Sequence, residues 1–445
     1  MRTPLTIAMV ASILLVSTIL FAVVLHTSSL PTSPPSDTLP VSKGATNVTY
    51  TSSDQKAQEA NKSIVKANTG FSLRLLKELQ TENEGRDVLI SPLSVSTALA
   101  MTYNGAGGST RDAMASTLGL SGLSIEEVNR GYGDLMGSLV GADGNATVSM
   151  GDSVWVRDVF APFVKENFTD TMKNYYDGGL YIRDFGSDTV KEINDWVSNE
   201  TRGKITGIVD DVSNDVMVLA NAIYFKGNWT TPFEAYMTSN RSFTLQDGEV
   251  IRVPTMMLSF TSLRYHRDNA TGVEMARLPY GSGKISMYIL LPPKGEPLGS
   301  FVDSLDASTL DTYFSGMSTQ TLEVELPKLS LEYGVKDLKV ALTKLGMGVA
   351  IDPSAADFSG LASGSPGRGL YIDSVYHKAM VEVNEKGKVA AAATAVVIAT
   401  SAEVPIGKWV DFAVDRPYLF LIRDDRSGSI LFLAEILDPT QGVSP

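Results

Sequence analysis

Few side chains in this 445-residue sequence could perform covalent catalysis. The chain has no cysteine and three histidines: His26, His266 and His377. The absence of cysteine excludes disulfides, a thiolate nucleophile and Cys-ligated zinc. A hydrolase using Ser374 or another serine has little support, because histidines are scarce and no G-x-S-x-G elbow is present. The sequence therefore predicts a protein that is not an enzyme and holds no metal or cofactor.

The bulk composition is that of a globular protein, with 43% hydrophobic and 20% charged residues. The formal net charge is −13. A nucleic-acid-binding protein needs a basic face, and no block rich in Lys and Arg occurs in the chain. The charge therefore predicts that nucleic acid is not a partner.

The stretch KVAAAATAVVIAT at 388–400 is almost wholly small and apolar. As a strand it would be apolar on both faces, which suits the middle of a sheet. A signal-like helix or an ordinary buried strand is the alternative interpretation of this run. However, SAEVPIGK follows it directly, and Pro405 and Gly407 there predict an exposed loop. One segment thus has the sequence of both a central strand and a surface loop, a conflict expected where a protein stores a conformational change.

The amino terminus has a different character from the rest of the chain. Leu5 to Leu25 is an uncharged run long enough to cross a bilayer, with a cleaved signal peptide as the alternative. We therefore assign 1–29 to an anchor or signal, 30–65 to a Ser/Thr/Pro-rich linker and 66–440 to the folded domain. Either form implies export, and an excess of N-x-S/T sequons supports a glycosylated, extracellular protein. The sequons begin at Asn47, Asn61, Asn145, Asn167, Asn199, Asn228, Asn240 and Asn269.

Hydrophobic periodicity predicts helices first and strands later. The expected helices are 71–80, 91–106, 163–176 and 190–204, the second with Ser91 as N-cap and Pro92 in its first turn. The expected strands are 216–225, 285–293, 322–333 and a hairpin within 416–439. The run at 216–225 is apolar on both faces, as in a central strand. Without regular βαβ alternation, this order favours a single α+β domain.

Four blocks of the chain resemble serpin signatures. They are DVLISPLSVSTALAMTYNGAGGST (87–110), LANAIYFKGNWTTPF (219–233), VYHKAMVEVNEKGKVAAAATAVVIATS (375–401) and DRPYLFLIRDDRSGSILFLAEILDPT (415–440). We identify the chain as a serpin, of the prokaryotic type. The resemblance implies a monomer with helices packed on a large, mostly antiparallel central sheet, two smaller sheets and an exposed reactive-centre loop.

It also implies a mechanism. In serpins a protease attacks the loop and forms an acyl-enzyme, and the cut loop then inserts as a central strand and traps the protease. Roughly ten to twenty new hydrogen bonds, at about 0.5–1.5 kcal/mol each, would supply on the order of 10 kcal/mol. Since this rivals the stability of a whole domain, the native state must be held kinetically.

Matching positions imply roles for individual residues. The hinge comprises Glu385, Gly387, Lys388, Ala390, Ala391, Ala392 and Ala393. The breach, where the loop first enters the sheet, contains Trp229. The shutter, a polar cluster under the sheet centre, comprises Ser91, Ser94, Asn221 and His377. Each of these polar residues would also serve as a satisfied hydrogen-bonding group in an ordinary core.

The hinge departs from the family pattern at Lys388 and Val389, where inhibitory serpins usually have Thr or Ser and then Glu. Insertion would carry the Lys388 ammonium toward the core, and full desolvation of this charge would cost on the order of several kcal/mol. The cost is avoided if the side chain reaches solvent at the sheet end. A non-inhibitory serpin, acting in binding, storage or as a chaperone, is therefore the alternative. Asp87 also replaces a common Asn.

The bait bond is placed by counting from the hinge glycine, which gives Ser401–Ala402. The bonds on either side of Glu403 remain alternatives. Small or apolar residues before the bond predict an elastase-like or subtilisin-like target, whereas a bond at Glu403 would imply a Glu-specific endopeptidase. We expect a secreted protein or one anchored to the outer face of the cell membrane.

Overall fold

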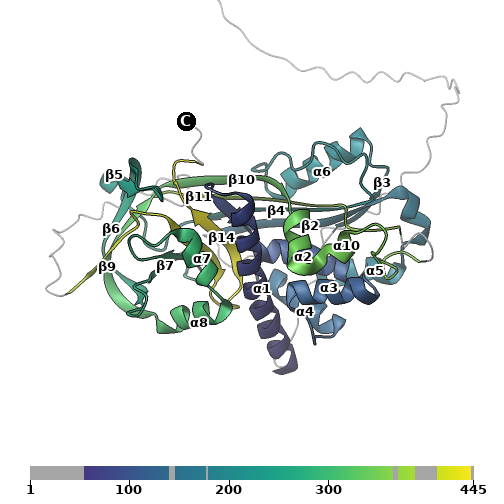
Figure 1. Ribbon diagram of the computed structural model, residues 1–445, viewed down its shortest axis with the longest axis horizontal. Coiled ribbons are helices and arrows are strands. Elements are labelled where there is room, and N and C mark those ends of the chain that lie inside the picture. The colour runs from purple at the N-terminus through teal and green to yellow at the C-terminus, as the bar shows by residue number, and fades with distance from the viewer. Residues whose placement is uncertain (1–54, 140–145, 177–178, 364–368, 386–407, 442–445) are drawn as a thin grey trace, which may run out of the picture. The chain divides into compact units, whose positions relative to one another are not determined.

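The computed structural model describes residues 55–139, 146–176, 179–363, 369–385 and 408–441 (Figure 1). Within them, helices pack on two sheets whose strand pairs are mostly antiparallel. The predicted α+β class is confirmed. None of the described helices has both the length and the apolar character needed to span a bilayer. The apolar run at 5–25 lies outside the described residues.

A five-stranded sheet has the order β10-β11-β4-β2-β3. Its strands are β2 (Ala146–Arg157), β3 (Gly179–Arg183), β4 (Met217–Gly227), β10 (Leu329–Asp337) and β11 (Ser374–Val383). The strand expected at 216–225 is β4, which lies at the centre of this sheet. It is buried over almost its whole length because helices cover both faces.

Alternate residues of β4 and β2 face two separate hydrophobic clusters. Leu219 and Ile223 belong to the main core, whereas Val218 and Ala222 belong to a smaller one. Helix α2 (Pro92–Tyr103) packs on the main-core face, and α6 (Ser187–Glu200) covers the other face, as Figure 1 shows. Every residue of α2 is buried, so its two ends are fixed by the surrounding core.

The second sheet has nine strands in the order β1-β14-β13-β8-β7-β6-β9-β12, with β5 paired to β6. Its strands are β1 (Val88–Ile90), β5 (Ser239–Thr244), β6 (Val250–Arg267), β7 (Glu274–Tyr280), β8 (Ile285–Leu291), β9 (Ser318–Pro327), β12 (Val410–Ala413), β13 (Tyr418–Asp424) and β14 (Ile430–Ile436). Two separate small sheets were expected. They are continuous here because β6, 18 residues long, pairs with strands on both sides.

The remaining helices complete the main core. They are α1 (Gln55–Glu82), α3 (Gly108–Leu118), α4 (Ile125–Leu139), α5 (Glu166–Thr171), α7 (Leu298–Ser304), α8 (Ala307–Gly316), α9 (Lys339–Leu342) and α10 (Gly348–Ile351). Short turns of π-helix follow α5 and α9, at Met172–Tyr176 and Thr343–Met347.

Three local expectations need correction. Helix α1 begins at Gln55, and Ile64 is fully buried, so packed structure extends into the range assigned to the linker. The strand expected at 322–333 is two strands in different sheets, divided at Lys328. Strands β2 and β3 lie between helices in the sequence, so helices and strands are less separated than expected.

Candidate functional site

The central feature of the five-stranded sheet is a parallel pair, β4 and β11. The register runs from Ser374↔Val218 to Val381↔Phe225. We call this pairing the seam. Strand β11 leads directly to residues 386–407, which lie outside the described residues. A segment that left β11, turned back and entered the seam would run antiparallel to both neighbours, which is a pairing each of them can accept.

A row of polar side chains crosses the seam. Asp152 on β2 pairs in register with Asn221 on β4, which pairs with His377 on β11. All three are buried on the face that packs against α2. The structure therefore brings together the predicted shutter residues Asn221 and His377 from strands far apart in the sequence.

The hydrogen bonds of this row define its donors and acceptors. Ser91 N donates to His377 Nε2 (3.1 Å), so the ring proton is on Nδ1, which faces Asn221 Oδ1. The Asn221 amide Nδ2 donates to Ser94 Oγ and to Asp152 Oδ1. Ser94 Oγ also donates to Asp152 Oδ1 (2.9 Å). All four predicted shutter residues thus contact this network, although Ser91 does so through its backbone.

Burial shifts the pKa of both titratable groups in the row. It lowers the pKa of His377 to about 3, which keeps the imidazole neutral and agrees with its acceptor role at Nε2. Burial raises the pKa of Asp152 to about 7, against hydrogen bonds from Ser94 and Asn221 that lower it. Sequence reasoning missed Asp152. The available signal was a lone carboxylate within β2, whose other residues before Arg157 are uncharged.

Trp229 lies where β11 leaves the sheet. Its Nε1 donates to the carbonyl of Asn384 (2.8 Å), the residue directly after β11. The indole stacks on Tyr280 with ring centroids 4.2 Å apart and meets Phe233 edge-on at 5.6 Å. Only 5% of Trp229 is exposed. The predicted breach residue therefore holds the chain at the end of the seam where Val381 pairs with Phe225.

Glu385, the first predicted hinge residue, is held beside this tryptophan. Phe233 N donates to its carbonyl (3.2 Å), Thr238 Oγ1 donates to Oε1 (2.9 Å), and Lys328 forms an ion pair with its carboxylate (3.0 Å). Burial opposes ionisation, but these side-chain hydrogen bonds and the Lys328 charge lower the pKa of Glu385 overall. Sequence reasoning missed Lys328, which lies between β9 and β10, and Thr238, which directly precedes β5.

The rest of the predicted hinge and the bait bond lie outside the described residues. These are Gly387, Lys388, Ala390, Ala391, Ala392, Ala393, Ser401 and Ala402. The chain is described again from Lys408. Trp409 there packs edge-to-face on Phe260, with centroids 5.4 Å apart, at the start of edge strand β12.

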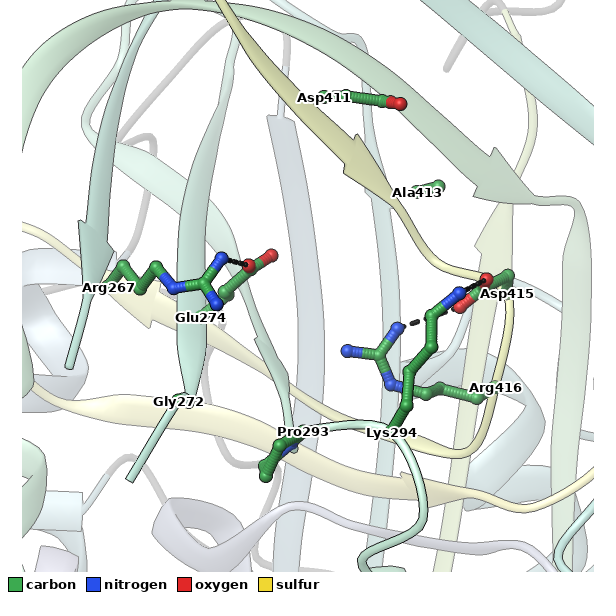
Figure 2. A pocket seen from close by; sticks show the side chains of 9 residues that line it. All are labelled: Arg267, Gly272, Glu274, Pro293, Lys294, Asp411, Ala413, Asp415 and Arg416. Atoms are coloured by element: carbon green, nitrogen blue, oxygen red, sulfur yellow. Dashed lines mark hydrogen bonds and ion pairs between the residues drawn. The ribbon is translucent and has the colours of Figure 1, made fainter. Parts of the chain in front are cut away.

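A pocket with a volume of about 420 Å³ lies beside β12 (Figure 2). The three cations that line it are already paired with carboxylates. Arg267 binds Glu274, and Lys294 and Arg416 both bind Asp415, as the dashed lines in Figure 2 show. These pairs leave little unsatisfied charge to recognise a ligand. We therefore take the seam as the candidate functional site.

The geometry gives no support to a hydrolase built on Ser374. Ser374 and His377 both lie on β11, but they are three residues apart and therefore face opposite sides of the sheet. Both nitrogens of the His377 ring are already engaged, with Ser91 and Asn221. The histidine is thus part of the seam.

Comparison with known proteins agrees with this arrangement. The family model Serpin (serine protease inhibitor) matches residues 66–439. The chain belongs to the serpin family.

Two relatives show how widely this family resemblance is spread. Serpin-ZXA from Oryza sativa subsp. japonica is 34% identical over 392 residues, covering 83% of this chain and 96% of its own length. An uncharacterized serpin-like protein from Thermococcus kodakarensis is 32% identical and covers 93% and 94%. Because plant and archaeal relatives match at similar identity, the prokaryotic type stays a prediction.

Solved serpin structures match the fold. The thermophilic serpin tengpin in its native state gives a TM-score of 0.75 at 29% identity, covering 84% of this chain and 94% of tengpin. Thyroxine-binding globulin in complex with thyroxine gives 0.74 at 27% identity, covering 85% and 99%. The serpin fold predicted from the sequence is therefore confirmed.

Proposed function

We propose that this serpin is a suicide-substrate inhibitor of serine-type proteases and not an enzyme. The observation that carries the proposal is the direct parallel pairing of β4 and β11, with β11 leading into residues 386–407. A protease would cut this segment as a substrate, and the amino-terminal part of the cut segment would enter the seam as a new strand.

The sequence of the segment suits this role. KVAAAATAVVIAT has small side chains at successive positions, and Ala390 to Ala393 offer little resistance to entry between two helix-covered faces. The new strand would gain ladder hydrogen bonds on both edges, on the order of 10 kcal/mol in total. Insertion must also be faster than deacylation, so the seam has to open quickly after cleavage.

Lys388 supports the competing function, a non-inhibitory serpin. Lys388 shares a strand face with Ala390 and Ala392, so insertion would move its ammonium toward the core face. Desolvation would slow insertion and shift some encounters to plain cleavage. The first inserted residues lie at the sheet end, where a lysine stem can reach solvent, and for that reason we favour inhibition.

The proposed target is an elastase-like or subtilisin-like protease that cuts at Ser401–Ala402, with bonds at Glu403 as the alternatives. Small side chains before the bond fit a shallow primary pocket. We place the inhibitor outside the cell as a monomer, secreted or tethered through 5–25, with glycans on its sequons. The apolar run and the sequons support this location.

The test is incubation with elastase, subtilisin, trypsin and a Glu-specific enzyme, followed by denaturing gels and mass spectrometry. Inhibition predicts a covalent band of high mass with one of the first two enzymes. Clipping without that band would favour the non-inhibitory alternative, and turnover of ester substrates would indicate an enzyme. Fast trapping of trypsin alone would overturn the target class.

A matched control is Ala392→Glu. It leaves the residues around the bait bond intact but places a carboxylate on the inserting face. The variant should be cut at the same bond and yield no covalent band. If Ala392→Glu traps the protease as well as the parent does, the segment does not insert as proposed.

A further inference from the structure

Asp152 stands out among the buried carboxyl groups because it joins the seam network directly. Only 6% of the residue is exposed, and it lies in register with Asn221, one strand away from the seam. Its Oδ1 accepts hydrogen bonds from Ser94 and Asn221. Its Oδ2 has no hydrogen-bond partner among the described residues.

The orientation of the Asn221 amide is set from both ends, by the Nδ1 proton of His377 and by an acceptor at Asp152. With Asp152 accepting from Nδ2, the Asn221 amide must present Oδ1 to the Nδ1 proton of His377. That contact is the side-chain link across the seam. Without the acceptor, Ser94 Oγ alone would hold Nδ2, and the amide could turn its oxygen away from His377.

Among the described residues, no cation contributes to the electrostatic environment of Asp152. Glu200 on α6 is a further carboxylate, and its negative charge adds to the effect of burial in raising the Asp152 pKa. The groups that donate hydrogen bonds to Asp152 from α2 and β4 are the neutral side chains of Ser94 and Asn221. His377 on β11 is also neutral. With the pKa at about 7, the closed seam binds a proton that the same carboxyl would release in water.

We propose that Asp152 is a positioning residue for the seam, which orients the Asn221 amide toward His377 and makes opening of the β4–β11 pair depend on loss of its own proton. The inference rests on the proposed function, since opening matters biologically only if a strand enters. When β4 and β11 separate, water can reach the row and hydrate the carboxylate. Opening is therefore favoured as the pH rises and opposed when Asp152 is protonated.

Hydrogen exchange of the intact protein tests this proposal without any protease. Amides in Ser374–Val381 and Val218–Phe225 report opening of the seam. Asp152→Asn keeps an acceptor and removes the charge, whereas Asp152→Ala removes both. Taking the ratio of parent to variant at each pH cancels the intrinsic pH dependence of exchange and the protonation of His377.

Glu435→Gln is the matched control. Glu435 is 1% exposed, accepts a hydrogen bond from Gln80 (2.8 Å) and has its pKa raised by burial to about 7, but it lies on β14 in the other sheet. The control removes an equally buried carboxyl away from the seam. It should leave the exchange rates of the seam amides unchanged relative to the parent.

The ratio of the exchange rate in the parent to that in Asp152→Asn should rise about tenfold or more between pH 5 and 8 and level off above the Asp152 pKa. Loss of one proton limits this rise to about tenfold per pH unit. Asp152→Ala should exchange faster than Asp152→Asn at every pH; if it does not fold, Asp152→Asn decides. A flat ratio, or the same change from Glu435→Gln, would overturn the proposal. If no protease is trapped but the ratio rises, the proposed function fails and the role of Asp152 stands.

Discussion

One buried strand pair from each sheet shows how the two sheets of this serpin differ. In the nine-stranded sheet, β13 and β14 pair antiparallel and are almost wholly buried, with mostly apolar side chains. In the five-stranded sheet, the central pair is parallel and is crossed by the row Asp152, Asn221 and His377. When two strands separate, each Å² of apolar surface that becomes exposed to water costs about 25 cal/mol. A polar side chain that loses its partner can instead form a hydrogen bond with water or with the entering strand. Under the proposed mechanism, this polar centre lies in the sheet that accepts the new strand.

Cutting the chain within 386–407 should produce the largest effect on this comparison. If the cut segment enters the seam, the five-stranded sheet gains a strand and on the order of 10 kcal/mol, so its thermal midpoint should rise sharply. Melting curves of intact and nicked protein measure this rise. Equal midpoints for the intact and the nicked protein would mean that the cut segment does not enter the five-stranded sheet and that the insertion model is wrong.

Two buried tryptophans, Trp155 on β2 and Trp229 just beyond the end of β4, allow a matched test of the end of the seam at Val381 and Phe225. Trp229 and Trp155 are both buried, and each stacks on a tyrosine with centroids 4.2 Å apart, yet only Trp229 binds the chain leaving β11. Replacement of either by Ala should cost about 3–5 kcal/mol of stability. Of the two variants, only Trp229→Ala should also speed hydrogen exchange at the end of the seam where Val381 pairs with Phe225.

Exchange measured by mass spectrometry on peptides covering Val381 and Phe225 separates these outcomes. If Trp155→Ala exposes the same peptides to the same extent, Trp229 contributes only general packing. If neither variant folds, the Phe replacements keep the test open, because Trp229→Phe removes the hydrogen bond to Asn384 at a cost of about 1 kcal/mol.

His377→Gln should change how the seam responds to acid. The folded pKa of His377 is about 3, below its ordinary value of 6.5, so protons bind preferentially to the unfolded chain between these values. The contribution of His377 to stability is therefore present above pH 6.5 and lost as the pH falls toward 3. At pH 5 the loss amounts to about 2 kcal/mol.

Denaturant unfolding at pH 7 and pH 5 checks this prediction. The parent should lose about 2 kcal/mol more than His377→Gln over that interval. Replacing His266 in the same way is the control, because that ring lies beside Tyr313, outside the seam. Identical acid sensitivity of the parent and His377→Gln would show that the histidine is already charged in the native state.

The sequence predicted much of this site, because a local run of residues carries the relevant signal. Asn221 and Trp229 lie in one family block, and the apolar pattern of 216–225 placed the central strand correctly. Asp152 was not found, since a lone carboxylate in a strand shows its burial only when β4 pairs beside it. Lys328 and Thr238 were missed for the same reason, being 57 and 147 residues from Glu385 in the chain.

Lys388→Thr should have the smallest effect, and it tests where the seam begins. Glu385, the first hinge residue and the last described residue before 386–407, already binds Lys328. Lys388 is therefore three residues beyond a carboxylate that already has a cation. If Lys388 enters the core face, threonine at this position should speed insertion and lower the molar ratio of inhibitor needed to silence the protease. Lys408→Thr removes the same charge from an exposed position beyond the loop and should leave that ratio unchanged. Titration of a protease with the parent and both variants gives the three ratios. An unchanged ratio for Lys388→Thr would mean that the ammonium stays in water at the sheet end, so the seam would accept its first buried residue only at Val389 or beyond.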